Sequence, residues 1–479
     1  MKSKFKSTFS ITDDSPREAC GVIGIFVPNE NVAKNVFFGL FALQHRGQES
    51  AGIAVSDGEN IRIHSKMGLI SQVFREEDLN SLTGYVGIGH TRYSTMGGSK
   101  ITNAQPIIVN GARGKLAVGH NGNVINADVL RDQIKKEWEV NFERTSDTEV
   151  IAELYANTPG NNWFDVSSSV MRRLSGAYSL VIMNKTELIA VRDPLGIRPL
   201  CLGKLGEDGW VVASETVALD NIGAEFVREL ENGETIVINN EGIKSKTWSG
   251  RRSSHAMCIF EHVYFARPDS VINGKLTYQT RLKMGSELWK EFPVEADFVT
   301  GVPDSSTPHA VGLARESGIP YLETLIKNRY VGRTFIQPDQ MIRNTDVKMK
   351  FNVLKSIVKD KKFIVVDDSI VRSTTIKRVV LLLKKAGAKE VHVRVAAPPI
   401  KSTCHFGVDM ATLNELIAYN MSTDQISNLI GADSLKYLSL DGLIKSVEGS
   451  NDTYCRGCFT GKYPIPVQLE MDKFTLEKK

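Results

Sequence analysis

The chain has 479 residues, enough for two or three domains of about 100 to 200 residues each, and we expect two large ones. Its 42% hydrophobic and 24% charged content is ordinary for a folded globular protein and excludes a disordered chain. The formal net charge of +4 is small, and Lys and Arg are spread along the chain, so nothing requires a nucleic-acid partner. The apolar runs fall far short of the roughly 20 residues that a membrane span needs, so we expect a soluble, cytoplasmic protein with no membrane partner.

Residues 1–19 are polar, carry charges of both signs and contain no apolar central stretch. A secretory signal needs such a stretch, and the acidic residues argue against an organelle transit peptide. We therefore interpret this segment as a leader of another kind, a propeptide that precedes Cys20.

From Cys20 to about residue 240, short runs typical of β-strands recur between Gly-rich turns. We expect strands at residues 21–27, 50–56, 84–90, 116–120, 177–183, 187–192 and 210–213, and helices at residues 32–44 and 148–156. This pattern predicts stacked sheets with flanking helices.

After residue 250 the chain alternates between strand and helix, which predicts a mostly parallel sheet. The clearest unit is a strand at residues 363–366, a helix at 375–386 closed by Gly387, and a strand at 391–397. This is a βαβ unit. We place the domain boundary near residue 250, which gives a leader of 1–19 and domains of 20–250 and 251–479.

Cys20 stands at the start of an apolar run, where a lone cysteine is usually a small buried hydrophobe. Three polar motifs follow it, at residues 89–95, 119–123 and 145–149. The order and spacing of the four motifs resemble the N-terminal-nucleophile glutaminase domain over about residues 20–240. This resemblance implies an αββα sandwich.

In the glutaminase family the leader is removed, so that the cysteine becomes the first residue. A freed α-amine has a pKa near 8, which suits a base that acts at neutral pH. The resemblance assigns Cys20 as nucleophile, and the Asn121 side chain and Gly122 N–H as donors to the oxyanion. It also assigns Arg92 to the α-carboxylate of glutamine and Asp147 to its α-ammonium group. An isolated Asn-Gly pair is more often a plain hairpin turn.

Residues 363–375 form a second motif, with a buried strand, the adjacent acids Asp367 and Asp368, a hydroxyl-rich loop and a helix start. Ligands of open α/β sheets bind at the carboxyl ends of strands, and phosphates favour helix N-termini. Adjacent carboxylates can accept from ribose hydroxyls or help to hold a hard cation. The alternative for a bare Asp-Asp-Ser is an acidic turn that caps a helix.

The whole motif resembles the phosphoribosyl pyrophosphate loop of type I phosphoribosyltransferases, most closely that of the glutamine phosphoribosyl pyrophosphate amidotransferases that start purine synthesis. Residues 264–270, 301–306 and 327–335 support the closer match. The resemblance implies a Mg²⁺ site at Ser305, Asp367 and Asp368, and a loop at about 327–352 that closes over the substrate. It assigns the following residues to substrate: Lys327, Arg333 and Lys350 to pyrophosphate, and Asp367, Asp368, Ser369, Arg372, Ser373, Thr374 and Thr375 to ribose phosphate.

Two positions depart from the family pattern. Ser373 follows the loop arginine where the family usually has Gly, and Lys348 stands where Arg is more usual. Gly tolerates positive φ and close approach of a ligand, so we expect a side chain at 373 to strain the loop or to weaken binding, by about 1 kcal/mol.

Four of the six cysteines form a further candidate site. Cys455 and Cys458 make a Cys-x-x-Cys pair, which alone is compatible with a zinc knuckle, a redox pair or a chance turn. Cys258 and Cys404 raise the count to four thiolates, enough for zinc or a 4Fe-4S cluster. The residues alone do not choose between these metals, but resemblance to the iron-sulfur branch of the amidotransferases implies a 4Fe-4S cluster with a structural role. We assign Cys201 to the core.

The two resemblances together predict an enzyme that makes 5-phosphoribosylamine, glutamate and pyrophosphate from phosphoribosyl pyrophosphate, glutamine and water. By family analogy it forms a homotetramer that purine nucleotides inhibit. One alternative is another glutaminase fusion, such as glucosamine-6-phosphate synthase or asparagine synthetase, which should lack residues 367–375. The other is a non-catalytic nucleotide-sensing or phosphoribosyl-binding regulator, which would need no processed Cys20.

Overall fold

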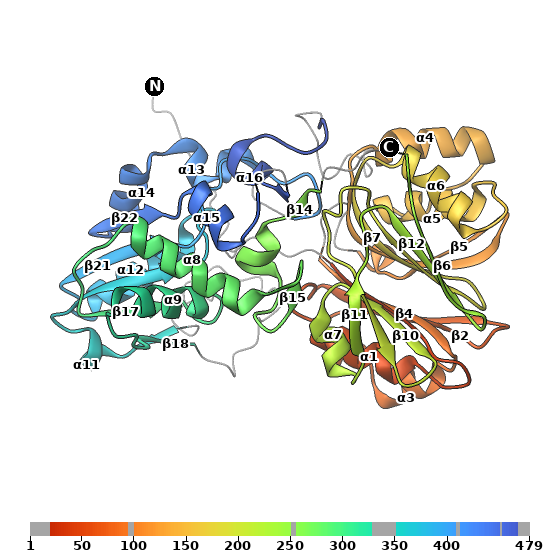
Figure 1. Cartoon of the computed structure of the whole chain (residues 1–479), viewed down its shortest axis with the longest axis horizontal. Helices are drawn as coiled ribbons and strands as arrows, with labels where there is room; N and C mark the ends of the chain where they lie inside the picture. The colour runs from red at the N-terminus through yellow and green to blue at the C-terminus, as the bar shows by residue number, and fades with distance from the viewer. Residues whose placement is uncertain are drawn as a thin grey trace, which may run out of the picture.

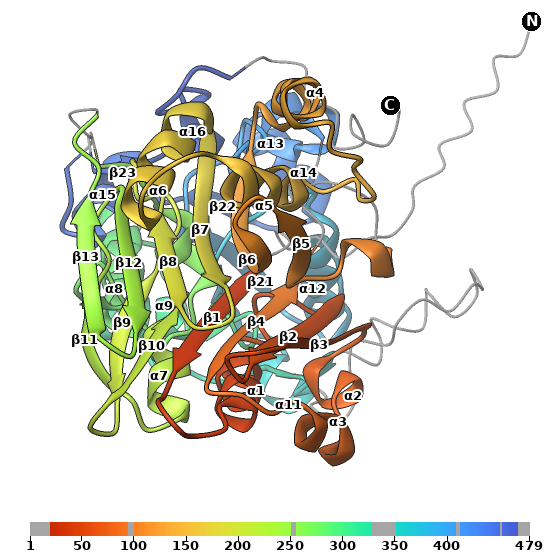
Figure 2. The ribbon, with the colours of Figure 1, turned by 90° about the vertical axis from the view of Figure 1, so that its right-hand side faces the viewer.

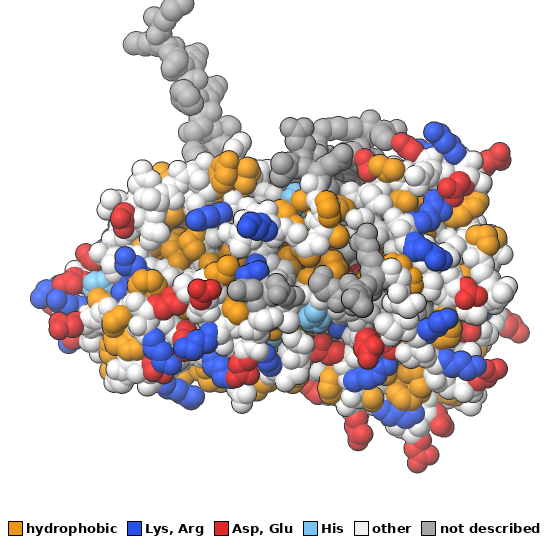
Figure 3. Space-filling model, turned by 45° about the horizontal axis from the view of Figure 1, so that its top comes forward, with side chains coloured by type: hydrophobic (Ala, Val, Ile, Leu, Met, Phe, Trp, Pro, Cys, Tyr) orange, Lys and Arg blue, Asp and Glu red, His pale blue; other side chains and the backbone are white. Residues whose placement is uncertain are grey.

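The structure is a computed structural model that describes residues 20–93, 100–250, 255–327, 351–408, 412–450 and 453–467. The N-terminal half, red to yellow-green, and the C-terminal half, green to blue, lie side by side along the longest axis in Figure 1. Acidic and basic side chains are interspersed on the face that Figure 3 shows, as the small net charge predicts. Within the described ranges no helix has the length and apolar character needed to span a bilayer.

Two antiparallel sheets form the N-terminal half, and Figure 2 shows one above the other. The seven-stranded sheet has the order β11-β9-β10-β1-β4-β2-β3 and the six-stranded sheet the order β13-β12-β8-β7-β6-β5. The strands are β1 (Gly21–Phe26), β2 (Ser50–Ser56), β3 (Ile61–Met67), β4 (Val86–Arg92), β5 (Ile107–Gly111), β6 (Gly114–Val124), β7 (Gly176–Met183), β8 (Leu188–Arg192), β9 (Cys201–Leu205), β10 (Gly209–Ala213), β11 (Glu225–Glu229), β12 (Glu234–Asn239) and β13 (Gly242–Thr247).

Helices cover the outer face of each sheet. The helices are α1 (Ala33–Ala42), α2 (Ile70–Val73), α3 (Glu76–Ser81), α4 (Ala127–Trp138), α5 (Asp147–Asn157), α6 (Trp163–Arg173), α7 (Thr216–Asn221) and the 3-10 turn η1 (Ile101–Asn103). Successive side chains of β1 point to opposite faces of the sheet and therefore pack in different hydrophobic cores. Ile23 packs with α1 and α7, whereas Val22 packs between the two sheets. A third core lies between the six-stranded sheet and helices α4 to α6. The predicted αββα sandwich is confirmed.

All seven predicted strands of this half are present, but β6 is longer than expected. It continues past residue 120 to Val124, because β7 pairs with it along that stretch, Asn121 opposite Ser179 and Gly122 opposite Tyr178. The Asn-Gly pair is therefore inside a strand, and the hairpin-turn alternative is wrong. Exposed strands such as β3 and β13, with mixed polar sequences, escaped prediction.

The C-terminal half is built on a parallel sheet of order β17-β20-β21-β22, with helices on both faces. Its strands are β17 (Phe298–Gly301), β20 (Lys362–Asp367), β21 (Glu390–Val395) and β22 (Ser434–Tyr437). Helices α8 (Thr277–Glu291), α9 (Thr307–Ser317) and α15 (Leu440–Ser446) share one core, and α12 (Thr374–Lys385) and α14 (Thr423–Ile430) share the other. The predicted mostly parallel sheet and its βαβ unit, β20-α12-β21, are confirmed.

Among the described residues, three pairs of short strands complete this half, and two of them join segments that are distant in the sequence. The pairs are β14 (Met257–Cys258) with β23 (Tyr454–Cys455), β15 (Val271–Ile272) with β16 (Lys275–Leu276), and β18 (Leu325–Lys327) with β19 (Phe351–Val353). The remaining turns are the π-helical η2 (Glu261–Phe265), the 3-10 turn η3 (Leu413–Glu415), α11 (Lys355–Val358), α13 (Ile417–Asn420) and α16 (Gly457–Thr460). The β14–β23 pair sets Cys258 opposite Cys455.

Candidate active sites

Cys20 immediately precedes β1, a central strand of the seven-stranded sheet. Its side chain is 5% exposed, and the thiol donates to the carbonyl oxygen of Tyr93 at 3.5 Å. Burial raises the pKa of the thiol above its usual value, although the positive charge of Arg92 opposes this effect. The thiol is thus protonated at neutral pH and needs a base to become a nucleophile.

Arg92 and Asp147 are brought to the same place by different elements. Arg92 ends β4, which pairs with β1, and Asp147 begins α5. Both are buried, and the charges of both act on the Cys20 thiol. One Asp147 oxygen accepts from the Val124 N–H at 3.0 Å, which fixes the carboxylate at the end of β6. A guanidinium and a carboxylate therefore flank the thiol, as recognition of an amino acid's two charged groups requires.

Asn121 lies in β6 with its side chain fully buried, and neither its Oδ1 nor its Nδ2 has a hydrogen-bond partner among the described residues. Buried polar groups are nearly always paired, so this amide is available to hydrogen-bond a ligand. Gly122 has a φ of 149°, and a Cβ there would lie 2.0 Å from the Ala177 oxygen, so only glycine fits. The pair supplies donors of the type that stabilise an oxyanion.

The second site lies at the carboxyl end of β20. The Ser306 hydroxyl lies 3.0 Å from Asp367 Oδ1 and 3.3 Å from Asp368 Oδ2, and the Asp368 N–H donates to Ser306 Oγ at 3.0 Å. Burial raises the pKa of Asp368, while hydrogen bonds from Ser305 and Ser369 lower it. Oxygen ligands in this number suit Mg²⁺ or ribose hydroxyls.

The loop after these acids ends at Ser373, whose φ of 66° is left-handed, and α12 begins at Thr374. The Ser373 side chain is buried, and the positive φ explains why Gly is usual there. Arg372 forms an ion pair with Glu415 at 3.3 Å. The N-terminus of α12 thus follows directly on this loop, the arrangement that phosphate-binding loops use.

Of the three cations assigned to pyrophosphate, Lys327 lies within the described residues. It ends β18, and its Nζ lies 2.7 Å from Asp304 Oδ2. Arg333 and Lys350 lie outside the described residues, as does Lys348.

The four cysteines of the candidate cluster come together. Cys258 and Cys455 are strand partners, and the Cys458 carbonyl accepts from the N–H groups of residues 401 and 402, close to Cys404. Burial raises the pKa of the Cys258 thiol to about 12, and the negative charge of Cys404 adds to this rise. Burial also raises the pKa of Cys455 and Cys458, and in both cases the other cysteines of the group contribute. Even so, no three His, Cys, Asp or Glu side chains in the described ranges form a group that could hold a metal ion.

Two contacts of the phosphate site escaped prediction. Ser306 directly follows Ser305 in the motif at residues 301–306, so its contact with Asp367 could have been predicted from the sequence. Arg281, buried in α8, exerts its positive charge on Asp368, but no local pattern marks it.

Comparison with known proteins matches both halves. The family model described as "Glutamine amidotransferase domain" matches residues 90–221, and the one described as "Phosphoribosyl transferase domain" matches residues 283–404. The amidophosphoribosyltransferase of Synechocystis sp. is 47% identical over 470 residues, 97% of this chain and 95% of the relative. That of Methanocaldococcus jannaschii is 47% identical over 468 residues, 94% of this chain and 98% of the relative.

Two solved structures share the whole fold. A glutamine phosphoribosylpyrophosphate amidotransferase from B. subtilis, complexed with ADP and GMP, has a TM-score of 0.88 and 44% identity, and covers 95% of this chain and 99% of its own. A structure described as the allosteric regulatory enzyme of purine biosynthesis has a TM-score of 0.88 and 45% identity, and covers 95% and 97%.

Proposed function

The chain belongs to the amidophosphoribosyltransferase family, and from this premise we propose how its residues divide the reaction between two centres. It is an enzyme that makes 5-phosphoribosylamine, glutamate and pyrophosphate from phosphoribosyl pyrophosphate, glutamine and water, the first committed step of purine (IMP) biosynthesis. The observation that carries the division is the buried Asn121 amide, which has no partner among the described residues. It lies on the strand whose Val124 N–H donates to Asp147, and the charge of Asp147 acts on the Cys20 thiol.

The glutaminase centre works with Cys20 as nucleophile, within a domain of residues 20–250. Removal of the leader, residues 1–19, frees an α-amine that takes the thiol proton. The sulfur then attacks the glutamine amide carbon, and Asn121 Nδ2 and the Gly122 N–H stabilise the oxyanion. The amide nitrogen leaves as ammonia, and water hydrolyses the thioester to glutamate. Arg92 and Asp147 hold the two charged groups of the substrate.

The phosphoribosyl centre lies in residues 251–479. The 5′-phosphate binds at the N-terminus of α12, held by Ser369, Arg372, Ser373, Thr374 and Thr375. Asp367 and Asp368 accept from the ribose hydroxyls. Ammonia attacks ribose C1 and pyrophosphate leaves, with its charge neutralised by Lys327, Arg333 and Lys350.

Mg²⁺ fits this centre, because Asp367 and Asp368 at the end of β20, and Ser305, which hydrogen-bonds Asp368, offer hard oxygen ligands. When bound, the ion would screen the charge of the departing pyrophosphate. Pyrophosphate release should therefore stop when Mg²⁺ is chelated.

The family resemblance supports a 4Fe-4S cluster at Cys258, Cys404, Cys455 and Cys458. The charges of the other cysteines of this set raise the pKa of Cys455 and of Cys458, although in the described ranges the four do not stand as a group that could hold a metal ion. Bound there, it would join those segments and have a structural role. Protein purified without oxygen should contain about four iron atoms per chain, and the variant Cys458→Ser should not.

We further propose that purine nucleotides inhibit the enzyme, that it forms a homotetramer and that it is cytoplasmic. The B. subtilis relative was solved with ADP and GMP, which supports control by purine nucleotides. Sedimentation of the processed enzyme with and without GMP tests both assembly and binding.

The alternative of a non-catalytic regulator is not favoured, because the near full-length relatives are named as enzymes. The decisive experiment compares pyrophosphate release driven by glutamine with release driven by ammonia, in wild type and Cys20→Ala. The variant should lose the first and keep the second. If it keeps both, Cys20 is not the nucleophile.

A further inference from the structure

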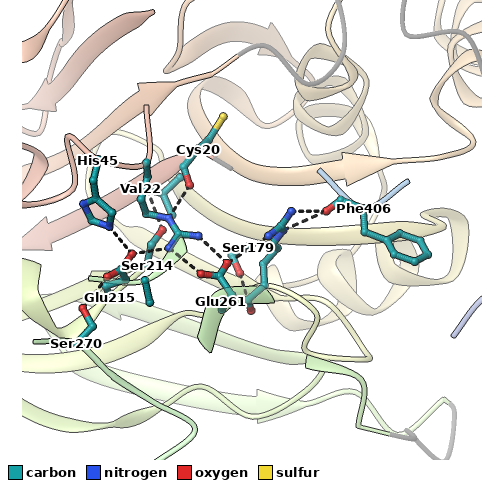
Figure 4. A network of polar contacts seen from close by, with 12 residues as sticks. Cys20, Val22, His45, Ser179, Ser214, Glu215, Glu261, Ser270 and Phe406 are labelled. Atoms are coloured by element: carbon teal, nitrogen blue, oxygen red, sulfur yellow. Dashed lines mark hydrogen bonds and ion pairs between the residues drawn. The ribbon is translucent and has the colours of Figure 1, made fainter. Parts of the chain in front are cut away.

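Four charged side chains form a fully buried ion network where the two halves of the chain meet: Arg46, Arg198, Glu215 and Glu261, called here the interdomain network. The first three come from the N-terminal half, and Glu261 begins η2 in the C-terminal half. The network contains two positive and two negative charges. Figure 4 shows it beside Cys20 and Phe406.

Glu261 holds the Arg46 guanidinium through both of its oxygens. Arg46 Nη2 lies 2.7 Å from Glu261 Oε1, and Arg46 Nη1 lies 3.0 Å from Glu261 Oε2. Glu215 accepts from the same Nη1, and it is held in turn by the Ser270 hydroxyl at 2.6 Å. A bidentate pair fixes the plane of the guanidinium as well as its position.

The third nitrogen of that guanidinium contacts the backbone of the nucleophile. Arg46 Nε donates to the backbone carbonyl of Cys20 at 3.2 Å. Once the leader is removed, Cys20 has no preceding residue, so its position depends on contacts on its carbonyl side. The strand pairing of Gly21 with Thr91 is one such contact, and Arg46 supplies another.

The segment that packs against the proposed oxyanion donor Gly122 also belongs to the C-terminal half. Arg198, which lies 3.2 Å from Glu261, donates to the Phe406 carbonyl through Nε at 3.0 Å and Nη2 at 2.8 Å. The next residue, Gly407, packs directly on the backbone of Gly122. The network therefore contacts the nucleophile at one end and the support of the oxyanion donor at the other.

We propose that Glu261 is a positioning residue for the glutaminase, supplied by the phosphoribosyltransferase half. It orients Arg46, which holds the Cys20 carbonyl, so the glutaminase geometry is complete only when the two halves are docked. This inference rests on the proposed role of Cys20 as the nucleophile. This role explains why the interdomain network includes a hydrogen bond to the Cys20 carbonyl. A network that only stabilised the interface would not need that bond.

The test is Glu261→Gln, which keeps the shape of the side chain and removes its charge. We expect the glutamine-dependent kcat to fall about 10- to 100-fold, since a displacement of about 1 Å can cost 10²-fold. The KM for glutamine should stay within about 3-fold, because Arg92 and Asp147 bind the substrate, and ammonia-dependent synthesis should stay within about 2-fold.

Glu234→Gln is the matched control, because Glu234 is also buried and forms two hydrogen bonds with an arginine, Arg228, that does not contact Cys20. It should leave both activities within about 2-fold of wild type. A charge-balanced variant, Arg46→Met with Glu261→Met, removes the ion pair together with the donor to Cys20. It should regain thermal stability relative to Glu261→Gln but not the glutamine-dependent rate.

Three outcomes would overturn the inference: unchanged glutamine-dependent kcat in Glu261→Gln, equal loss of both activities, or recovery of the glutamine-dependent rate in the balanced variant. If Glu261→Gln does not fold, the balanced variant decides. Loss of glutamine-dependent activity in the wild-type enzyme would contradict the proposed function itself, whereas loss in Glu261→Gln alone bears on the positioning role.

Discussion

Gly122 and Gly407 lie against each other across the two halves of the chain, so closely that a Cβ on Gly407 would sit 2.6 Å from the Gly122 carbonyl carbon. Gly407 also has a φ of 94°, which disfavours any side chain. The proposed oxyanion donor is thus packed against the segment that carries Cys404.

Gly407→Ala should therefore impair the glutaminase selectively. We expect about 1–3 kcal/mol lower free energy of unfolding from overpacking, and at least about 10-fold lower glutamine-dependent kcat as Gly122 shifts. Ammonia-dependent synthesis should change less than about 2-fold. Gly242→Ala is the control for backbone strain, since Gly242 has a φ of 105° and open space around it. Equal loss of both activities in Gly407→Ala would contradict this view.

Replacement of Asn121 by an apolar residue should lower activity without lowering stability. Asn121→Leu removes an unpartnered buried amide, so the free energy of unfolding should be unchanged or higher by up to about 1–3 kcal/mol. The proposed role predicts that the glutamine-dependent kcat falls about 10²- to 10³-fold, the usual cost of removing an oxyanion donor. Urea unfolding and steady-state rates measure the two effects.

Asn123 provides the contrast two residues along the same strand. Its Nδ2 donates to the His405 carbonyl at 2.9 Å, so Asn123→Leu should lose about 1 kcal/mol of stability. A marked destabilisation by Asn121→Leu would mean that the Asn121 amide has a structural role.

The sequence predicted those features that depend on local pattern. The apolar run after Cys20 became β1, and the run before Asp367 became β20 with its helix. The left-handed backbone expected at Ser373 is also present.

What escaped prediction depends on contacts between distant residues. Arg46 and Glu261 are 215 positions apart, and neither lies in a recognisable motif. The strand pair that joins Cys258 to Cys455 has two residues on each side, too few to produce a periodic pattern. Contacts between the two halves decide the first feature and contacts within the C-terminal half decide the second, and local sequence propensity predicts neither.

Ser373→Gly should relieve the strain of a left-handed residue in the phosphate loop. We expect a gain of about 0.5–1 kcal/mol in the free energy of unfolding, and a KM for phosphoribosyl pyrophosphate lower by up to about 5-fold. Glu139→Gly is the matched control, because Glu139 is exposed and has a φ of 55° at the end of α4. It should give a similar gain in stability with no change in KM. A higher KM in Ser373→Gly would mean that the Ser373 hydroxyl contributes more to binding than its strain costs.

His262 should make the protein less stable in acid. Burial, together with the charge of Arg281, lowers its pKa to about 3, from 6.5 in an unfolded chain. Between pH 6.5 and 3 the unfolded chain therefore binds a proton that the folded protein does not, so stability is complete above pH 6.5 and falls with pH through that window. The loss amounts to about 1.4 kcal/mol per pH unit for one such group.

His262→Phe should reduce this acid sensitivity. Phenylalanine keeps the edge-on contact with the Tyr454 ring, whose centroid lies 5.8 Å away, and removes two ring nitrogens that have no partner among the described residues. The fall in the free energy of unfolding between pH 7.5 and pH 5, measured with urea, should be smaller than in wild type by about 2 kcal/mol. At pH 8, where the histidine is neutral in both states, the variant should be at least as stable as wild type. An identical fall in both proteins would show that His262 already carries its proton in the folded state at pH 5.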